Sequence, residues 1–215
     1  MFEKLTGHTR VHVPFTALNT VHRLIDTASL TILDVGCGRG ESMLGLRSYL
    51  TANTVGVDTF RPYLKHCQQS ILHDAHVQGD ALRLPFRDRS FDTVLSLEVL
   101  EHVEKKDALL FLSELERVAR IQVILTTPNG HFHLDAFDGN PYQQHRSEWS
   151  PTEMRALGYR VIGRGVRGLG GIMHSTRSLA KWTRPLQYFL WIGAGPLASV
   201  VPGLAGDLVC IKSVQ

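Results

Sequence analysis

The chain has 215 residues and a formal net charge of +3 with histidines neutral, so it is long enough for one hydrophobic core and only weakly basic. Its hydrophobic fraction is that of an ordinary globular protein, and it contains no repeat or low-complexity segment. Its lysines and arginines are dispersed, which makes a nucleic-acid partner unexpected. The scattered Cys37, Cys67 and Cys210 and the polar first ten residues predict reduced thiols and a single cytoplasmic domain over 1–215.

Helical and strand-like segments alternate along the chain. A leading helix is predicted over 14–29, and an apolar strand follows it at 30–35. The pattern then predicts helices at 41–50, 61–72, 107–120 and 151–158, and strands at 54–57, 75–79, 91–97, 121–126, 159–166 and 207–214. This alternation is typical of an α/β fold with a Rossmann-like, doubly wound and mostly parallel sheet.

Three glycines at alternate positions follow the first strand. Gly36, Gly38 and Gly40 separate this strand from the helical pattern that begins at Glu41, as in a loop whose backbone approaches a ligand closely. The second strand ends at Asp58, near the place where a βαβ unit positions a ribose-binding carboxylate. The segment therefore predicts a nucleoside-containing ligand.

Nicotinamide dinucleotides are the first alternative for that ligand. A pyrophosphate needs the helix N-terminus as a free anion site, and Glu41 stands there, with Asp34 at the end of the preceding strand. A ligand that carries cations, such as the ammonium and sulfonium of S-adenosylmethionine, fits a loop flanked by acids better. The sequence favours a methyl donor over a dinucleotide.

The stretch from 130 to 150 has no regular periodicity and holds His131, His133 and His145. A long loop at the carboxyl end of a strand is commonly part of a ligand site. It ends at Ser150, which is followed by Pro151 and Glu153 and is therefore predicted to cap the next helix.

The segment 186–206 contains no charged residue, although glycines and prolines interrupt it. Three interpretations remain open: a lid over the core, a helix lying on a membrane surface or a lipid, and a membrane span. A strand at 207–214 would have to return to the sheet, so the span ranks last. We treat 171–206 as an apolar insertion after a cofactor-binding core at 30–170.

The motifs together resemble the class I S-adenosylmethionine-dependent methyltransferases, including a broad bacterial type 11-like group. The resemblance covers roughly 30–167 and rests on the run at 33–40, on Val57-Asp58, on the runs at 79–81 and 84–86, and on the runs at 91–92 and 98–103. It implies a sheet of order 3-2-1-4-5-7-6 with an antiparallel last strand. It also implies S-adenosylmethionine as the cofactor.

The same resemblance implies roles for individual residues. Asp34 would lie near the methionine ammonium, Asp58 would bind the ribose hydroxyls, and Asp80 with Ala81 would face the adenine. The remaining residues implied for this pocket are Gly36, Cys37, Gly38, Gly40, Thr59, Phe60 and Glu98.

A second pattern involves carboxylates and imidazoles. Glu98, Glu101 and His102 at i, i+3 and i+4 would share one helical face, and with His145 they resemble the metal site of small-RNA 3′-end 2′-O-methyltransferases. The ubiquinone-pathway O-methyltransferases share the first three residues. Because this run also occurs in methyltransferases with no metal requirement, our prediction is no metal, and these four residues are the alternative metal set.

The sequence thus predicts methyl transfer to a small-molecule acceptor, with a hydrophobic or lipid-like acceptor as one option. A hydroxyl acceptor calls for a base near neutral pKa, and we expect His145 first and His102 second. The alternatives are a metal-dependent RNA 2′-O-methyltransferase and a non-catalytic S-adenosylmethionine-binding module. Contact with a membrane surface through 186–206 is a further expectation, and the oligomeric state is not predicted.

Overall fold

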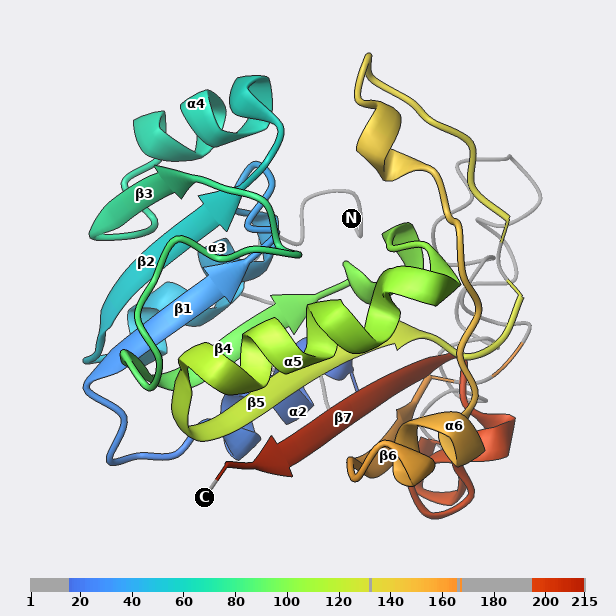
Figure 1. Cartoon of the computed structure of the whole chain (residues 1–215). Coiled ribbons are helices and arrows are strands. Elements are labelled where there is room, and N and C mark those ends of the chain that lie inside the picture. Colours follow the sequence, from blue (N-terminus) through green and yellow to red (C-terminus); the bar gives the residue numbers. More distant parts are fainter. Residues whose placement is uncertain (1–15, 132, 166, 168–194, 215) are drawn as a thin grey trace, which may run out of the picture.

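A computed structural model describes residues 16–131, 133–165, 167 and 195–214. Seven strands among them form one sheet in the order β3-β2-β1-β4-β5-β7-β6 (Figure 1). The strands are β1 Thr31–Val35, β2 Asn53–Asp58, β3 Ala75–Gln78, β4 Phe91–Leu97, β5 Ala119–Pro128, β6 Arg160–Arg164 and β7 Asp207–Ser213. β7 runs antiparallel to both of its neighbours, β5 and β6, and all the other strand pairs of this sheet are parallel. The predicted fold class, strand order and antiparallel last strand are confirmed.

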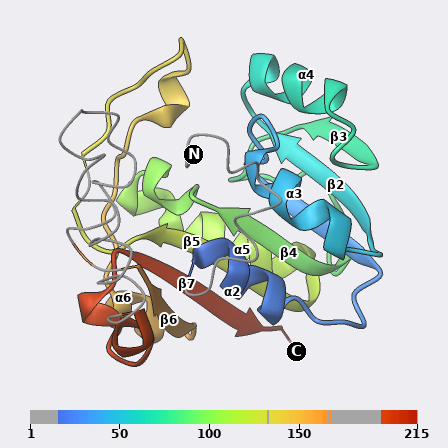
Figure 2. The same ribbon diagram turned by 180° about the vertical axis from the view of Figure 1, so that it is seen from behind.

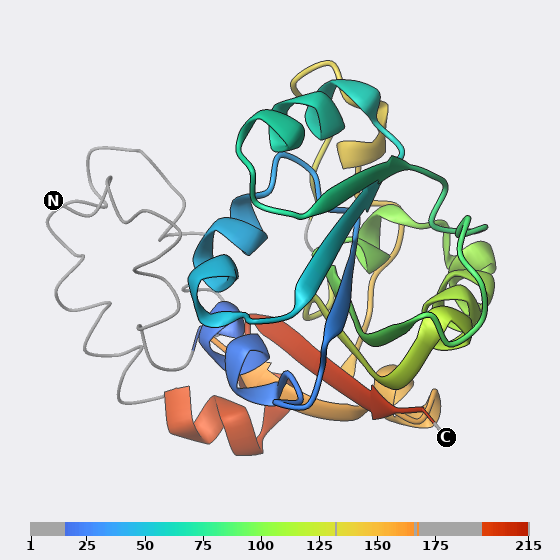
Figure 3. The same cartoon turned by 90° about the vertical axis from the view of Figure 1, so that its left-hand side faces the viewer.

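Helices cover both faces of this sheet. They are α2 Ala17–Leu24, α3 Glu41–Leu46, α4 Arg61–Gln69, α5 Ala108–Val118 and α6 Pro151–Ala156. Helix α5 lies in front of the sheet in Figure 1, and the view from behind in Figure 2 brings α2 and α3 to the front. The side view in Figure 3 separates these two layers.

The central strands are apolar on both faces because both faces are covered. On β1, Leu33 packs into the core on the α5 side with Phe111, whereas its neighbour Ile32 packs into the core on the α2 and α3 side with Val21 and Met43. All five of these side chains are fully buried. The central strands are thereby fixed, and their carboxyl ends form one rigid edge.

Several predicted boundaries are wrong by a few residues. The leading helix begins after its N-cap Thr16, residues 14 and 15 lie outside the described part, and the helix ends at Leu24. The helix predicted over 41–50 ends at Leu46 and gives way to a 3-10 turn, η2 Arg47–Tyr49. The helix predicted over 61–72 ends at Gln69, shortly before Ile71 adopts a φ of +50°.

The predicted cap of α6 is confirmed. The Ser150 hydroxyl oxygen accepts a hydrogen bond from the Glu153 N–H at 3.3 Å, and a Glu153 carboxylate oxygen accepts one from the Ser150 N–H at 2.9 Å. This capping box satisfies two backbone donors at the end of the long 130–150 loop. It fixes the point at which that loop returns to the core.

The predicted apolar insertion is only partly described. Residues 186–194 lie outside the described part, while 195–200 is helical and is followed by η6 Pro202–Leu204. The Asn129 amide donates to the carbonyl oxygens of Pro202 and Ala205 at 2.9 and 2.8 Å, which holds this piece against the end of β5. Among the described helices, none is both long and apolar enough to cross a bilayer.

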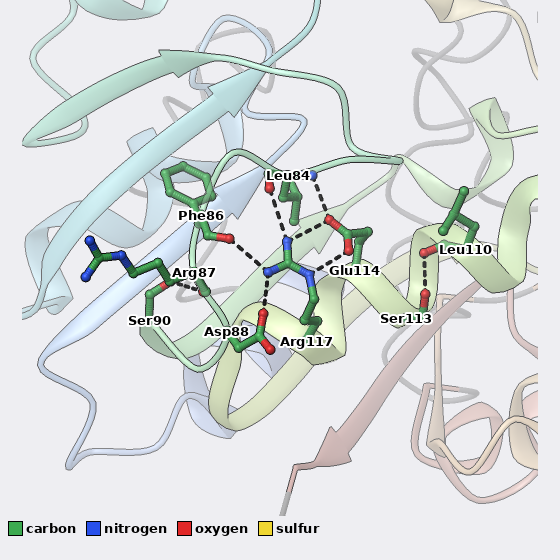
Figure 4. A network of polar contacts seen from close by, with 9 residues as sticks. All are labelled: Leu84, Phe86, Arg87, Asp88, Ser90, Leu110, Ser113, Glu114 and Arg117. Atoms are coloured by element: carbon green, nitrogen blue, oxygen red, sulfur yellow. Dashed lines mark hydrogen bonds and ion pairs between the residues drawn. The ribbon is translucent and has the colours of Figure 1, made fainter.

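Arg117 on α5 fixes the loop between β3 and β4 (Figure 4). Its guanidinium donates to the carbonyl oxygens of Leu84 and Phe86 at 3.1 and 2.8 Å and to the Glu114 carboxylate at 2.6 and 2.8 Å. A Glu114 carboxylate oxygen also accepts a hydrogen bond from the Leu84 N–H at 2.7 Å. One side chain therefore satisfies several backbone groups of a loop that has no regular structure of its own.

We predict that Arg117→Met lowers the free energy of unfolding by about 2 kcal/mol, because it removes the guanidinium donor from two loop carbonyls and from the carboxylates of Asp88 and Glu114. Urea denaturation measures this change. Arg87→Met is the matched control, since Arg87 lies on the same loop but points away from the network (Figure 4) and should have little effect. Equal midpoints for the two variants would contradict this account.

Candidate active site

A cavity of about 290 Å³ lies at the carboxyl ends of β1, β2 and β4. Ligands bind at this edge of a doubly wound sheet, at the point where the strand order reverses. In Figure 1 the edge faces the space between α4 and the loop that follows β5. The cavity is lined by Val35, Gly36, Gly38, Val57, Asp58, Thr59, Gly79, Asp80, Ala81, Leu82, Glu98, Val99, His102, Val103, Glu104, Asp107, Asn140, Tyr142, Gln143 and Arg146.

The glycine turn after β1 brings bare backbone to this cavity. The N–H groups of Gly36 and Cys37 both donate to the Val57 carbonyl, at 2.8 and 3.0 Å. Gly36 has a φ of +76°, and a Cβ on it would come within 2.4 Å of a Val99 methyl carbon, so the turn requires glycine here. A Cβ on Gly38 would meet no atom closer than 4.0 Å and would extend into the cavity instead.

Asp58 joins this turn to the end of β2. One carboxylate oxygen accepts the Gly38 N–H at 2.8 Å, and the other accepts the Phe60 N–H at 2.7 Å. Burial raises the pKa of Asp58, and these two backbone donors oppose that shift. Each carboxylate oxygen has further lone pairs. The side chain can therefore accept additional hydrogen bonds from a ligand in the cavity that it lines.

The loop between β3 and β4 supplies the opposite end of the wall. A carboxylate oxygen of Asp80 accepts the Leu82 N–H at 2.9 Å, which closes a tight turn. Asp80, Ala81 and Leu82 all line the cavity, as does Thr59 from the neighbouring loop. The Arg117 network holds the continuation of this same loop.

Four predicted cofactor residues do not line the cavity. Asp34 is 3% exposed and accepts a hydrogen bond from the His73 ring at 3.0 Å beneath the turn. Cys37 is buried, Gly40 is the N-cap of α3, and Phe60 is the N-cap of α4. Asp34, Cys37 and Gly40 therefore belong to the support of the turn, and Phe60 belongs to the start of α4.

Glu98 corrects the predicted helical face. It lines the cavity, but its φ is +58°, and only Leu100–His102 form a helical turn, η3. Its N–H donates to the Thr126 hydroxyl oxygen at 3.0 Å, which stabilises a conformation that non-glycine residues rarely adopt. Glu98 is an exposed residue, but desolvation of its carboxyl group and the nearby Asp207 carboxylate raise its pKa to about 7. The idea that Glu98, Glu101 and His102 share one helical face is wrong.

Glu101, His102 and His145 nevertheless come together. One ligating atom from each lies within 4.8 Å of the other two. Glu101 is 2% exposed, one of its carboxylate oxygens has no hydrogen-bond partner among the described residues, and burial raises its pKa well above the usual range. Glu98 is outside this group, so the alternative metal set is only partly assembled.

His102 is the imidazole on the cavity wall. Its Nδ1 lies 3.1 Å from the Gln144 carbonyl oxygen, which can only accept, so Nδ1 carries the proton and Nε2 keeps a lone pair. Burial lowers the pKa of His102. The His145 ring packs edge-on against His102, with centroids 4.9 Å apart, and does not line the cavity. Of the two candidate bases, His102 is thus the one that lines the cavity.

The loop 133–150 brings further residues to the cavity that the sequence analysis did not single out. Tyr142 and Arg146 line it. The Asp138 carboxylate also accepts hydrogen bonds from Tyr63 on α4, at 3.1 Å, and from Arg39 in the glycine turn. The polar density of this loop indicated a ligand site, but nothing in the sequence distinguished these residues from the exposed His131 and His133.

Comparisons with known proteins agree with this geometry. Residues 33–126 match the methyltransferase domain family. The chain is 32% identical over 177 residues to the phthiotriol/phenolphthiotriol dimycocerosates methyltransferase of Mycobacterium tuberculosis, which covers 75% of this chain and 60% of that protein. It is 30% identical over 177 residues to the fatty-acid O-methyltransferase of Mycolicibacterium smegmatis, with 78% and 60% covered. The chain thus spans about 60% of the length of these curated relatives.

A similar fold occurs in the magnesium protoporphyrin IX methyltransferase of Synechocystis, solved with bound S-adenosylhomocysteine. The TM-score is 0.57 at 16% identity, and the alignment covers 97% of this chain and 86% of that one. The domain match over residues 33–126, the similarity to the mycobacterial methyltransferases and the sheet topology all agree with the resemblance to class I methyltransferases and with S-adenosylmethionine as the cofactor.

Proposed function

We propose that this protein transfers the methyl group of S-adenosylmethionine to an oxygen of a small, lipid-like acceptor. One observation carries the proposal: a carboxylate-bearing glycine turn and a neutral imidazole, that of His102, line the same cavity. The glycine turn and its carboxylate suit a nucleoside donor, and the imidazole suits an acceptor hydroxyl that must lose a proton.

The chemistry of the wall fits the donor. Among the described residues, five carboxylates and one guanidinium, that of Arg146, line the cavity. The carboxylates are those of Asp58, Asp80, Glu98, Glu104 and Asp107. An acid-rich wall favours a ligand with ammonium and sulfonium groups. Asp58 would accept the ribose hydroxyls, Gly36 and Gly38 would admit the methionine portion, and Asp80 with Ala81 would flank the adenine.

When bound, the cofactor supplies a methyl group already activated by a cationic sulfur. The protein's task is to align an acceptor oxygen and to exclude water. Nε2 of His102 would accept the proton that an acceptor hydroxyl loses as its oxygen is methylated. The Gln144 carbonyl holds the tautomer in which that nitrogen is free to do so.

Two features support a lipid-like acceptor. Leu82, Val103 and Tyr142 give the wall an apolar portion. The relatives with substantial sequence identity carry the names of a phthiotriol methyltransferase and a fatty-acid methyltransferase. The described part of the apolar insertion also exposes a patch that would suit contact with a lipid surface, made of Leu197, Val200, Val201 and Leu204.

With methyl-labelled S-adenosylmethionine, we expect label to enter long-chain acceptors, either fatty acids or hydroxylated lipids, and not their short-chain counterparts. His131→Gln is the control, because His131 is exposed and does not line the cavity, and it should keep wild-type turnover. Label transfer to RNA alone would instead support the alternative RNA methyltransferase. If the protein binds S-adenosylhomocysteine but transfers label to no acceptor, the result would support the alternative of a non-catalytic S-adenosylmethionine-binding module.

With a hydroxyl acceptor, the rate should fall as the pH drops through the lowered pKa of His102, below the ordinary value of 6.5, because only the neutral imidazole accepts a proton. His102→Gln should reduce kcat about 100-fold and abolish this acidic limb. With a fatty acid, which is already ionised, the same variant should lose far less. Rate profiles against pH for both acceptors measure the difference.

Two outcomes would contradict a base role for His102. A limb near pH 7 that persists in His102→Gln would assign the titration to Glu98. Equal losses in Glu101→Gln, His102→Gln and His145→Gln would instead favour a metal held by those three side chains, because a base does not need its neighbours as ligands.

A further inference from the structure

A second group of soft and nitrogen ligands lies behind the glycine turn. Cys67 from α4, His73 from the loop after it and His76 from β3 each offer one ligating atom within 4.8 Å of the other two. Cys67 and His73 are buried, and His76 is half-buried. None of the three lines the cofactor cavity. The group is therefore separate from the site described above.

The hydrogen bonds of this group are arranged as in a metal site. His73 uses Nε2 to contact the Asp34 carboxylate at 3.0 Å, and its Nδ1 lies 3.5 Å from the Cys67 sulfur. A carboxylate behind an imidazole is the usual partner of a metal-bound histidine, since it fixes the ring and the tautomer. Nε2 of His76 is buried and has no partner among the described residues. An unpaired buried nitrogen is costly unless something binds it.

Cys37 lies beside the group. A Cβ built on Gly56 would come 3.0 Å from the Cys37 sulfur and 3.1 Å from Nδ1 of His73, so both atoms border the same small space. Any side chain larger than hydrogen at position 56 would fill it. The Cys37 thiol lies outside the trio of residues grouped above, and it is the candidate for a fourth ligand beside His73.

We propose that Cys67, His73 and His76, with Cys37 as the fourth ligand, form a structural binding site for a zinc-class divalent cation. Two thiols and two imidazoles are the donor set that tetrahedral zinc prefers. His76 also lies in the wall of a second cavity, of about 190 Å³, whose other lining residues are Arg61, Leu64, Lys65, Gln68 and Gln78.

The ion would fasten α4 and β3 to the cofactor turn. The Cys67 sulfur lies 3.0 Å from the position of a Cβ on Gly40, and Asp34 lies on β1, one residue before its end. A metal that binds the folded chain and not the unfolded chain raises stability by mass action. Its effect is thus on the turn that shapes the donor pocket, and it does not depend on which acceptor is methylated.

In the absence of metal, the same residues form a hydrogen-bonded thiol and imidazole network. The two states differ in a measurable property, because a thiolate bound to Co²⁺ gives an intense charge-transfer absorption that the network alone does not. Titration of the full-length, reduced, metal-stripped protein with Co²⁺ should give this absorption with one equivalent, together with tetrahedral ligand-field bands. Zn²⁺ should then displace the Co²⁺ and raise Tm.

Two variants distinguish binding at the proposed site from binding to exposed histidines elsewhere on the protein. His76→Gln should weaken Co²⁺ binding at least 10-fold, whereas His66→Gln, an exposed residue of the same α4 helix, should leave it unchanged. Binding of S-adenosylhomocysteine to each variant verifies that it is folded. Absence of the charge-transfer band in the wild-type protein, or a band that His76→Gln leaves unaltered, would overturn the proposal.

Discussion

The Asp58 carboxylate connects three parts of the molecule that the chain supplies separately: the turn after β1, the end of β2 and the start of α4. It does so with two short hydrogen bonds from backbone N–H groups. A partly buried carboxylate keeps its charge only if such donors compensate for the lost water. The position of Gly38 at the cavity therefore depends on Asp58. We propose that a ribose diol takes the remaining lone pairs.

The same turn is supported from behind by a second buried carboxylate. Asp34 and His73 form an ion pair with almost no exposure to solvent. Burial alone would lower the pKa of His73, but hydrogen bonds to Asp34 and Cys67 raise it to about 9. Removal of one partner would leave an uncompensated charge in the interior. The acids that flank the glycine loop thus have different tasks, since Asp34 holds the scaffold and Asp58 faces the cavity.

The fold was predictable because local patterns and the resemblance to a known family agree with the tertiary structure. Alternating helical and strand-like segments predicted the sheet, and the resemblance supplied its strand order. The errors arise where long-range contacts decide the outcome. Nothing near Asp34 in the sequence indicates that His73 withdraws it from the cavity. Likewise, the spacing of Glu98 and Glu101 suggests a helix, but bonds to Thr126 on β5 hold Glu98 in a left-handed conformation.

The central claim is that a glycine turn fixed by Asp58 binds S-adenosylmethionine and its product, S-adenosylhomocysteine, through the nucleoside and amino-acid groups that the two share. Calorimetric titration with S-adenosylhomocysteine and with NAD tests it most directly. The account predicts that the wild-type protein and the exposed-site control Asp135→Ala bind S-adenosylhomocysteine and not NAD. Asp58→Ala should bind S-adenosylhomocysteine about 10- to 100-fold more weakly, as expected for lost hydrogen bonds to a charged group. Unchanged affinity in a folded Asp58→Ala variant, or equally tight binding of NAD, would contradict the account.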